Sequence, residues 1–243
     1  MLEFIKNTES GVTEVGKGKL IVIEGSGDGI GKSTQVRRLT ERLAADGAPF
    51  YCHHFPSYGT VQGAPVSEYL SGAFGPPETL SPYFINNLYA LDRAVTWHGE
   101  LKARVEAGET VVLDRYVTSS LIYQSALIED ADEKLAFVRY VSDYEYEKLG
   151  VGRPDVVIFL HVPPDVSRAL RAARGGEGVI EGDIHESDGG FMTKVYESAV
   201  TVARYLGWSW IECSKDGVMR DPGDIAREIY GVCADAGRGG GKE

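Results

Sequence analysis

The chain has 243 residues, 43% of them hydrophobic and 25% charged, and a formal net charge of −11 at pH 7. This composition is typical of a globular domain, and the acidic balance argues against a nucleic-acid partner, so a few well-placed cations must meet any bound phosphates. No stretch approaches the roughly 18 apolar residues of a membrane span, and the first residues lack the apolar block of a signal peptide. Three cysteines with no C-x-x-C pair favour a cytoplasmic protein without a disulfide framework.

A glycine-rich loop follows the first predicted strand. Residues 1–17 are polar and irregular, and we expect a flexible extension before a single domain over 18–235. Residues 20–23 are apolar and predict a buried strand, the sequence GSGDGIGKST follows at 25–34, and helical spacing continues to 45. This order of strand, loop, lysine, hydroxyl and helix is the context of a P-loop, whose backbone amides and helix N-terminus bind phosphates.

The whole loop is predicted to bind ATP, with Lys32 reaching the β- and γ-phosphates and Ser33 offering its hydroxyl to Mg²⁺. The predicted ATP-binding residues are Gly25, Ser26, Gly27, Asp28, Gly29, Ile30, Gly31, Lys32, Ser33 and Thr34. A strict P-loop pattern wants glycine at position 26, so we interpret the loop as one residue longer than usual. The alternative is a glycine-rich turn before an ordinary helix.

The remaining elements alternate between strands and helices. Strands are predicted at 49–55, 110–113, 156–162 and 208–212, and helices near 66–70, 82–106, 117–128, 131–148, from 165 onward, 191–206 and 222–235. In the long helix, Leu88, Leu91 and Val95 are expected to form the buried stripe. The glycine-rich stretch 175–190 predicts a short mobile lid, and 236–243 a disordered tail. The alternation predicts an α/β fold, a three-layer α/β/α domain with a five-stranded parallel sheet.

A second group of polar motifs lies at the carboxyl ends of the predicted strands, where open α/β sheets bind ligands. The motifs are Phe55-Pro-Ser-Tyr58, Tyr89-Ala-Leu-Asp-Arg93 and the run DRYVTSSLIYQ at 114–124. Together they offer an aromatic face, two guanidinium groups and several hydroxyls. This set suits a nucleotide acceptor, because a base stacks on an aromatic ring while arginine binds carbonyl and phosphate oxygens.

With these motifs in this order and at these spacings, the sequence resembles the thymidylate kinases over about residues 19–230. The resemblance implies ATP, dTMP and Mg²⁺ as ligands and a homodimer packed through helices. It also implies that Asp28 binds the sugar 3′-hydroxyl, Tyr89 stacks on thymine, Arg93 bonds a thymine carbonyl, Arg115 holds the acceptor phosphate and Asp114 lies near Mg²⁺. Further substrate-binding residues implied are Phe55, Tyr58, Ser119, Ser120, Tyr123 and Gln124.

The chain departs from the family pattern in three segments. Many relatives carry arginine in the Phe-Pro motif, where this chain has Ser57 and Tyr58, and bacterial-type relatives often carry one where Val179 stands. Gly29 leaves the glycine loop without an arginine as well. The remaining candidates for a cation at the transferred phosphoryl group are Arg168, Arg171 and Arg174, which share one side of a predicted helix. Of these we favour Arg174 and then Arg171, so the predicted catalytic residues are Asp28, Lys32, Arg115, Arg171 and Arg174.

Other interpretations of the same residues stay open at this point. Tyr89 and Arg93 can be a packing aromatic and a solvated cation, Asp114 and Arg115 a strand-end ion pair, and Tyr123 plain helix core. For the whole chain, the alternatives to a dTMP kinase are a deoxynucleoside kinase, which phosphorylates a neutral 5′-hydroxyl, and a catalytically weak nucleotide-binding relative. A GTPase is disfavoured, because the sequence has neither Asn-Lys-x-Asp nor Thr-Lys-x-Asp.

Overall fold

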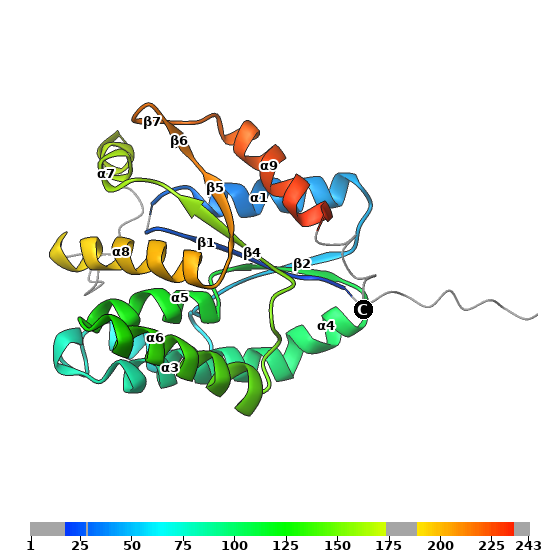
Figure 1. Cartoon of the computed structure of the whole chain (residues 1–243). Coiled ribbons are helices and arrows are strands. Elements are labelled where there is room, and N and C mark those ends of the chain that lie inside the picture. Colours follow the sequence, from blue (N-terminus) through cyan, green and yellow to red (C-terminus); the bar gives the residue numbers. More distant parts are fainter. Residues whose placement is uncertain (1–17, 28, 174–188, 236–243) are drawn as a thin grey trace, which may run out of the picture.

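The computed structural model describes residues 18–27, 29–173 and 189–235. Its central sheet has five strands in the order β2-β3-β1-β4-β5, and each neighbouring pair is parallel (Figure 1). The strands are β1 (Leu20–Gly25), β2 (Phe50–His54), β3 (Thr110–Asp114), β4 (Val156–His161) and β5 (Ser209–Glu212). The predicted fold class is therefore confirmed, with each of the five strands within two residues of its predicted bounds.

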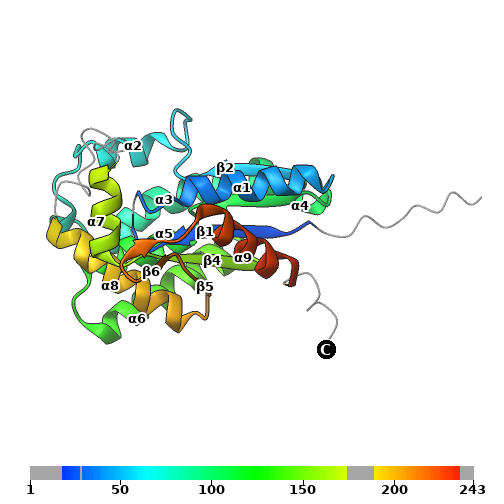
Figure 2. The ribbon, with the colours of Figure 1, turned by 90° about the horizontal axis from the view of Figure 1, so that it is seen from above.

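Helices cover both faces of the sheet. Helices α1 (Lys32–Ala45) and α9 (Pro222–Asp235) pack on one face (Figure 1). The other face carries α3 (Pro82–Thr96), α4 (Lys102–Glu106), α5 (Val117–Tyr123), α6 (Ala131–Ser142) and α8 (Gly189–Tyr205). Helices α2 (Ala64–Leu70) and α7 (Pro164–Ala173) stand near the carboxyl ends of the strands, as the view from above shows (Figure 2).

The alternation of side chains along β1 divides the core between the two faces. Leu20 and Val22 belong to the cluster shared with α3 to α6, whereas Ile21 and Ile23 belong to the cluster shared with α1 and α9. All four are at most 2% exposed. A strand that is buried on both faces has a continuous run of apolar residues, and for this reason residues 20–23 predicted a buried strand.

Two of the long predicted helices change geometry before they end. A π-helical segment, η2 (Trp97–Leu101), separates α3 from α4, and a second one, η4 (Asp143–Lys148), extends α6. Short 3₁₀ turns lie at η1 (Pro77–Thr79) and η3 (Ser125–Leu127). A small antiparallel hairpin, β6 (Ser214–Lys215) and β7 (Val218–Met219), was not predicted.

The predicted buried stripe of α3 was wrong. Leu91 and Val95 are 51% and 47% exposed, and Leu88 is only partly buried. The buried face instead carries polar groups, including Asn86 and Arg93 at 0% and 1% exposure. The hydrophobic pattern gave the wrong buried face for this helix. Arg93 lies on the buried face because a buried carboxylate pairs with it, and this pairing offsets the cost of burying its charge.

Several expectations fall on residues outside the described ranges. They are the extension at 1–17, the tail at 236–243 and nearly all of the lid; residues 189 and 190 of that stretch begin α8. In the described part of the chain no helix is long and apolar enough to cross a membrane.

Candidate functional site

The glycine loop connects β1 to α1 and leaves a helix N-terminus open toward an anion. Gly31 precedes the helix at φ 98°, a left-handed conformation that glycine adopts without strain. Among the described residues no side chain caps α1, and its first turn holds no acid. The Nζ of Lys32 donates to the Gly27 carbonyl at 2.6 Å, so its ammonium lies within the loop. The geometry suits a phosphate group, because the first helical amides and the lysine share one small region.

Ser26 has a structural role that accounts for the departure from the strict pattern. Its Oγ donates to the Val162 carbonyl and accepts from the Val162 amide, both at 3.0 Å. The hydroxyl therefore fastens the start of the loop to the end of β4, a bond that glycine cannot make.

Ser33 and Asp114 form the candidate metal site. The Ser33 hydroxyl donates to Asp114 Oδ2 at 3.4 Å, while Asp114 Oδ1 is buried without a hydrogen-bond partner in the described part of the chain. An oxygen ligand of that kind suits Mg²⁺, which takes one or two protein oxygens and completes its shell with phosphates and water. No cluster of three His, Cys, Asp or Glu side chains occurs among the described residues. The residues thus fit a metal that arrives with its nucleotide.

His54 also approaches this carboxylate. Its Nδ1 lies 3.3 Å from Asp114 Oδ2, and its ring stacks on that of Tyr58 at a centroid distance of 6.2 Å. Tyr58 is 44% exposed. The sequence favours a filling role at the strand end for His53 and His54, since no acidic residue lies near them in the chain. The sheet supplies the acid, because His54 on β2 and Asp114 on β3 are register partners.

Arg115 follows Asp114 directly but serves the other side of the site. Its φ of 68° is one of two positive φ values among the described non-glycine residues, a conformation that costs an L-residue free energy. Its Nη2 donates to the Tyr123 hydroxyl at 3.4 Å, and its guanidinium lies 5.2 Å from the centre of that ring. The turn at Arg115 thereby aims the guanidinium at α5, away from the Ser33 contact of its neighbour.

Arg93 is held by a buried network. Its Nε and Nη2 donate to the two carboxylate oxygens of Glu145, each at 2.6 Å, and Nη2 also donates to Ser120 Oγ at 2.9 Å. Burial lowers the pKa of Arg93, but the charge and hydrogen bonds of Glu145 outweigh this and hold the pKa above its ordinary value. The Asn86 Oδ1 accepts from Nη2 at 3.4 Å, whereas Asn86 Nδ2 is buried without a partner among the described residues.

The other predicted substrate residues fall into two groups. Tyr89 lies beside the Arg93 guanidinium, 6.0 Å from ring centre to carbon, and Gln124 is buried one helical turn after Ser120. Phe55 is 3% exposed and packs on the Tyr116 ring at 5.6 Å, so it supports the site from the core.

Ser119 has a partner that the sequence did not indicate. Its hydroxyl donates to Glu24 at 2.5 Å, and Thr118 donates to the same oxygen at 3.0 Å. Glu24 is fully buried at the end of β1 and also accepts from the Gly25 amide at 3.0 Å. This carboxylate therefore connects the start of the glycine loop to α5, the helix that carries most of the DRYVTSSLIYQ run.

Helices α7 and α8 flank the glycine loop. A Cβ added to Gly29 would stand 3.1 Å from Arg171 Cγ, and one added to Gly27 would stand 3.9 Å from Met192 Cε. Arg171 is thus beside the loop, as a phosphoryl-group cation requires. Asp28 and Arg174, two of the predicted catalytic residues, lie outside the described residues.

A cavity of about 290 Å³ lies on the α1 side of the glycine loop. It is lined by Ile30, Gly31, Thr34, Gln35, Leu160, Leu170, Cys213, Met219, Arg220, Asp221, Pro222 and Ile225. Its position next to the loop suits the base of the nucleotide whose phosphates the loop binds. Sequence patterns missed it, because its walls come from α7, the β6–β7 hairpin and the start of α9.

Comparisons with known proteins agree with this geometry. The profile of the thymidylate kinase family matches residues 23–216. The thymidylate kinase of Mycobacterium tuberculosis (strain ATCC 25618 / H37Rv) is 33% identical over 217 residues, covering 86% of this chain and 96% of that protein. A probable thymidylate kinase of Pyrobaculum aerophilum is 30% identical over 210 residues, covering 86% and 93%. A solved thymidylate kinase from Candida albicans shares the fold with a TM-score of 0.65, at 20% identity over 90% of this chain and 92% of its own.

Proposed function

Because the chain belongs to the thymidylate kinase family, we propose that it transfers the γ-phosphoryl group of ATP to the 5′-phosphate of dTMP, with Mg²⁺, to give ADP and dTDP. An oxygen of the dTMP phosphate forms the new bond to the γ-phosphorus, and the bond to the ADP oxygen breaks. Such a reaction needs positioning and charge neutralisation, and no covalent enzyme intermediate.

The observation that carries this proposal is the divergence of Asp114 and Arg115. Asp114 meets Ser33 at the end of the glycine loop, and the next residue meets Tyr123 on α5. One strand end therefore serves a donor site with its metal and an acceptor site with its phosphate cation. A kinase acting on a neutral 5′-hydroxyl has no need of a cation there, which favours the monophosphate over the nucleoside as acceptor.

On the donor side, we assign the phosphates to the glycine loop and Lys32, the adenine to the cavity beside Ile30, and Mg²⁺ to Ser33 and Asp114. On the acceptor side, Arg115 and the neutral Tyr58 hydroxyl hold the phosphate. The base stacks on Tyr89 and bonds to Arg93. Residues assigned to the walls of the base and sugar pocket are Ser119, Ser120, Tyr123 and Gln124, with Asp28 at the sugar 3′-hydroxyl.

Two further properties belong to the proposal. We assign the chain to the cytoplasm, which its three free cysteines support. We also propose a homodimer packed through helices, supported by the exposed apolar residues of α3: Phe84 at 41%, Leu91 at 51% and Val95 at 47%.

A panel assay tests the reaction directly. Purified protein with ATP and Mg²⁺ is offered thymidine, dTMP, dUMP, dCMP, dGMP and dAMP, and both ADP release and the phosphorylated product are measured. We expect turnover of dTMP, weaker turnover of dUMP and poor turnover of the rest. A site that hydrogen-bonds a polar group of one base rejects a base without that group, because the polar group of the site is then left unpaired. Phosphorylation of thymidine would identify a deoxynucleoside kinase, nucleotide binding without turnover a weak relative, and efficient use of dGMP or dAMP would overturn the assignment.

A further inference from the structure

Glu145 is the buried carboxylate on which Arg93 depends. Glu145 is 0% exposed and Arg93 is 1% exposed, although the two come from segments 52 residues apart. The contact is a paired one, with Nε and Nη2 on separate carboxylate oxygens at 2.6 Å. Since Nη2 also bonds Ser120, these contacts occupy three of the five guanidinium N–H groups. The fork geometry fixes the plane of the guanidinium as well as its place.

We propose that Glu145 is a positioning residue for base recognition, which it performs by turning the Nη1 edge of Arg93 toward the base; this rests on the function proposed above. Among the described residues, Nη1 makes one weak hydrogen bond, to the Tyr116 carbonyl at 3.4 Å. A guanidinium can only donate, so a fixed Nη1 donates to a thymine carbonyl and cannot pair with the amino group that cytosine carries at the same place. While Glu145 holds the guanidinium of Arg93 in one plane, Arg93 distinguishes thymine from cytosine. Without Glu145 the guanidinium can turn away from the cytosine amino group, and the discrimination is lost.

The segment around Glu145 supports a specific role for this one acid. Glu145 lies in the π-helical η4, and π-helical turns occur frequently at functional sites. Its neighbours in η4, Asp143 and Glu147, have side chains 57% and 54% exposed, and Glu147 pairs on the surface with Arg153 at 2.6 Å. Of these three acids only Glu145 turns inward. Glu147 therefore offers a matched control on the same segment.

The test compares Glu145→Gln with Glu147→Gln in steady-state kinetics with dTMP and dCMP at saturating ATP and Mg²⁺. For Glu145→Gln we expect kcat/KM for dTMP to fall at least about tenfold, chiefly through KM, while kcat/KM for dCMP changes less than about threefold. Affinity for ATP stays unchanged, and Glu147→Gln behaves as the wild type. If folded Glu145→Gln kept the wild-type ratio of kcat/KM for dTMP to kcat/KM for dCMP, the proposal would be overturned.

A double-mutant cycle keeps the test decisive if Glu145→Gln does not fold. The pair Arg93→Met with Glu145→Met replaces both charges with apolar side chains, which buried ion pairs often tolerate. Arg93→Met alone leaves the Glu145 carboxyl buried without its partner, so this single variant is less stable and that carboxyl takes up a proton. If Glu145 acts through Arg93, the ratio of kcat/KM for dTMP to kcat/KM for dCMP is lowered in both variants and has the same value in each. A further change of this ratio in the double variant would show that Glu145 acts independently and would sink the proposal. Absence of dTMP turnover in the wild type would instead refute the proposed function.

Discussion

Arg171 lies against Gly29, its Cγ only 3.1 Å from the place where a Cβ on Gly29 would stand. Gly29 has φ 70°, so its lack of a side chain serves both the turn and the approach of the arginine. The glycine loop that lacks an arginine of its own thus has one beside it, supplied by α7. This relationship favours Arg171 as the cation that stabilises the transferred phosphoryl group.

We therefore expect Arg171→Ala to slow phosphoryl transfer at least about tenfold in single turnover with saturating ATP and dTMP, because an arginine at the migrating group contributes about 10³–10⁵ in rate. Rapid-quench measurement of dTDP isolates this step from product release. Arg168→Ala tests the third candidate on the same helix; because Arg168 is exposed and only Arg171 of the two is placed against Gly29, we expect this variant to transfer close to the wild-type rate. If neither Arg171→Ala nor Arg174→Ala loses tenfold, the cation comes from another residue or the enzyme works without one.

Arg115 combines a positive φ with the proposed role of holding the acceptor phosphate. Arg115→Ala should lower kcat/KM for dTMP roughly 30- to 150-fold, because a charge-assisted contact to phosphate is lost. This corresponds to about 2–3 kcal/mol of lost transition-state stabilisation. ATP affinity measured without acceptor should change little. Equal weakening of ATP binding would show that Arg115 serves the donor site or the fold.

A companion variant separates the side chain from the backbone. Arg115→Gly loses the same guanidinium but relieves the left-handed conformation, so urea unfolding should find it about 1 kcal/mol more stable than Arg115→Ala. Equal stability of the two would mean that the turn at residue 115 carries no strain.

The sequence predicted the parts of this molecule whose causes are local. Short stretches of sequence predict three of its features: the strand β1 from its apolar run, the phosphate loop from the glycines before Lys32, and the end of β3 from Asp114-Arg115. The observed sheet agrees with these predictions. The missed features depend on partners far away in the chain. Nothing near Glu145 marks it as the partner of Arg93, and Glu24 meets Ser119 only because β1 and α5 adjoin.

The error on α3 has the same origin. Periodicity assigns Leu91 and Val95 to the core because it cannot distinguish a face buried within one chain from an apolar face that is exposed in the single chain. The buried face was decided instead by a charge pair with another helix, which a single-segment pattern cannot represent. His54 and the lining of the cavity beside Ile30 were missed because they are brought into place by neighbouring strands and by the unpredicted hairpin.

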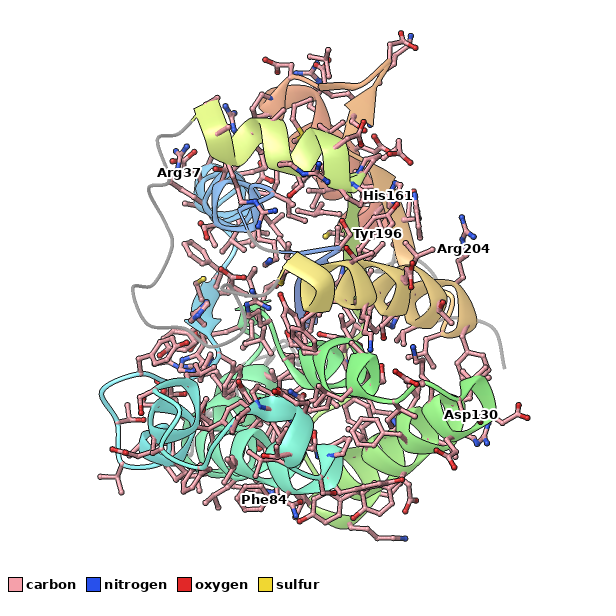
Figure 3. All side chains as sticks on the ribbon, turned by 90° about the vertical axis from the view of Figure 1, so that its left-hand side faces the viewer. Arg37, Phe84, Asp130, His161, Tyr196 and Arg204 are labelled. Atoms are coloured by element: carbon pink, nitrogen blue, oxygen red, sulfur yellow. The ribbon has the colours of Figure 1, made fainter. Side chains whose placement is uncertain are left out.

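The exposed apolar residues of α3 predict the effect of charge on assembly. Phe84 lies at the outer side of the helical layer, away from the sheet (Figure 3). We expect Leu91→Asp with Val95→Asp to convert a dimer to a monomer in sedimentation velocity, because a dry interface does not tolerate unpaired charge. Val61→Asp, at a residue that is 91% exposed, should leave the oligomeric state unchanged. Unchanged sedimentation of the double variant would place the interface elsewhere.

The buried thiols predict how stability depends on pH. Burial raises the pKa of Cys213 from 9.0 to about 12 and that of Cys233 from 9.0 to about 11. Below pH 9 both thiols are neutral in the folded and unfolded states, so they contribute no pH dependence. Above pH 9 the unfolded chain releases these protons while the folded chain keeps them, which favours unfolding. Each thiol should lower the free energy of unfolding by up to about 1.4 kcal/mol per pH unit as the pH rises toward its folded pKa.

Urea unfolding between pH 8 and 10 measures this slope before tyrosines, whose ordinary pKa is about 10, begin to dominate. Cys213→Ala should be less stable at pH 8, because it leaves a small cavity, yet its stability should fall less steeply above pH 9. Partial burial also raises the pKa of Cys52, although this thiol is exposed, so Cys52→Ala should reduce the slope less than Cys213→Ala does. If Cys213→Ala retained the full slope, the thiol at 213 would ionise as readily in the folded chain as in the unfolded one. The cavity wall at Cys213 would then have to admit water or bring the Arg220 guanidinium closer to the thiolate, because Leu160, Met219 and Ile225 cannot stabilise the charge.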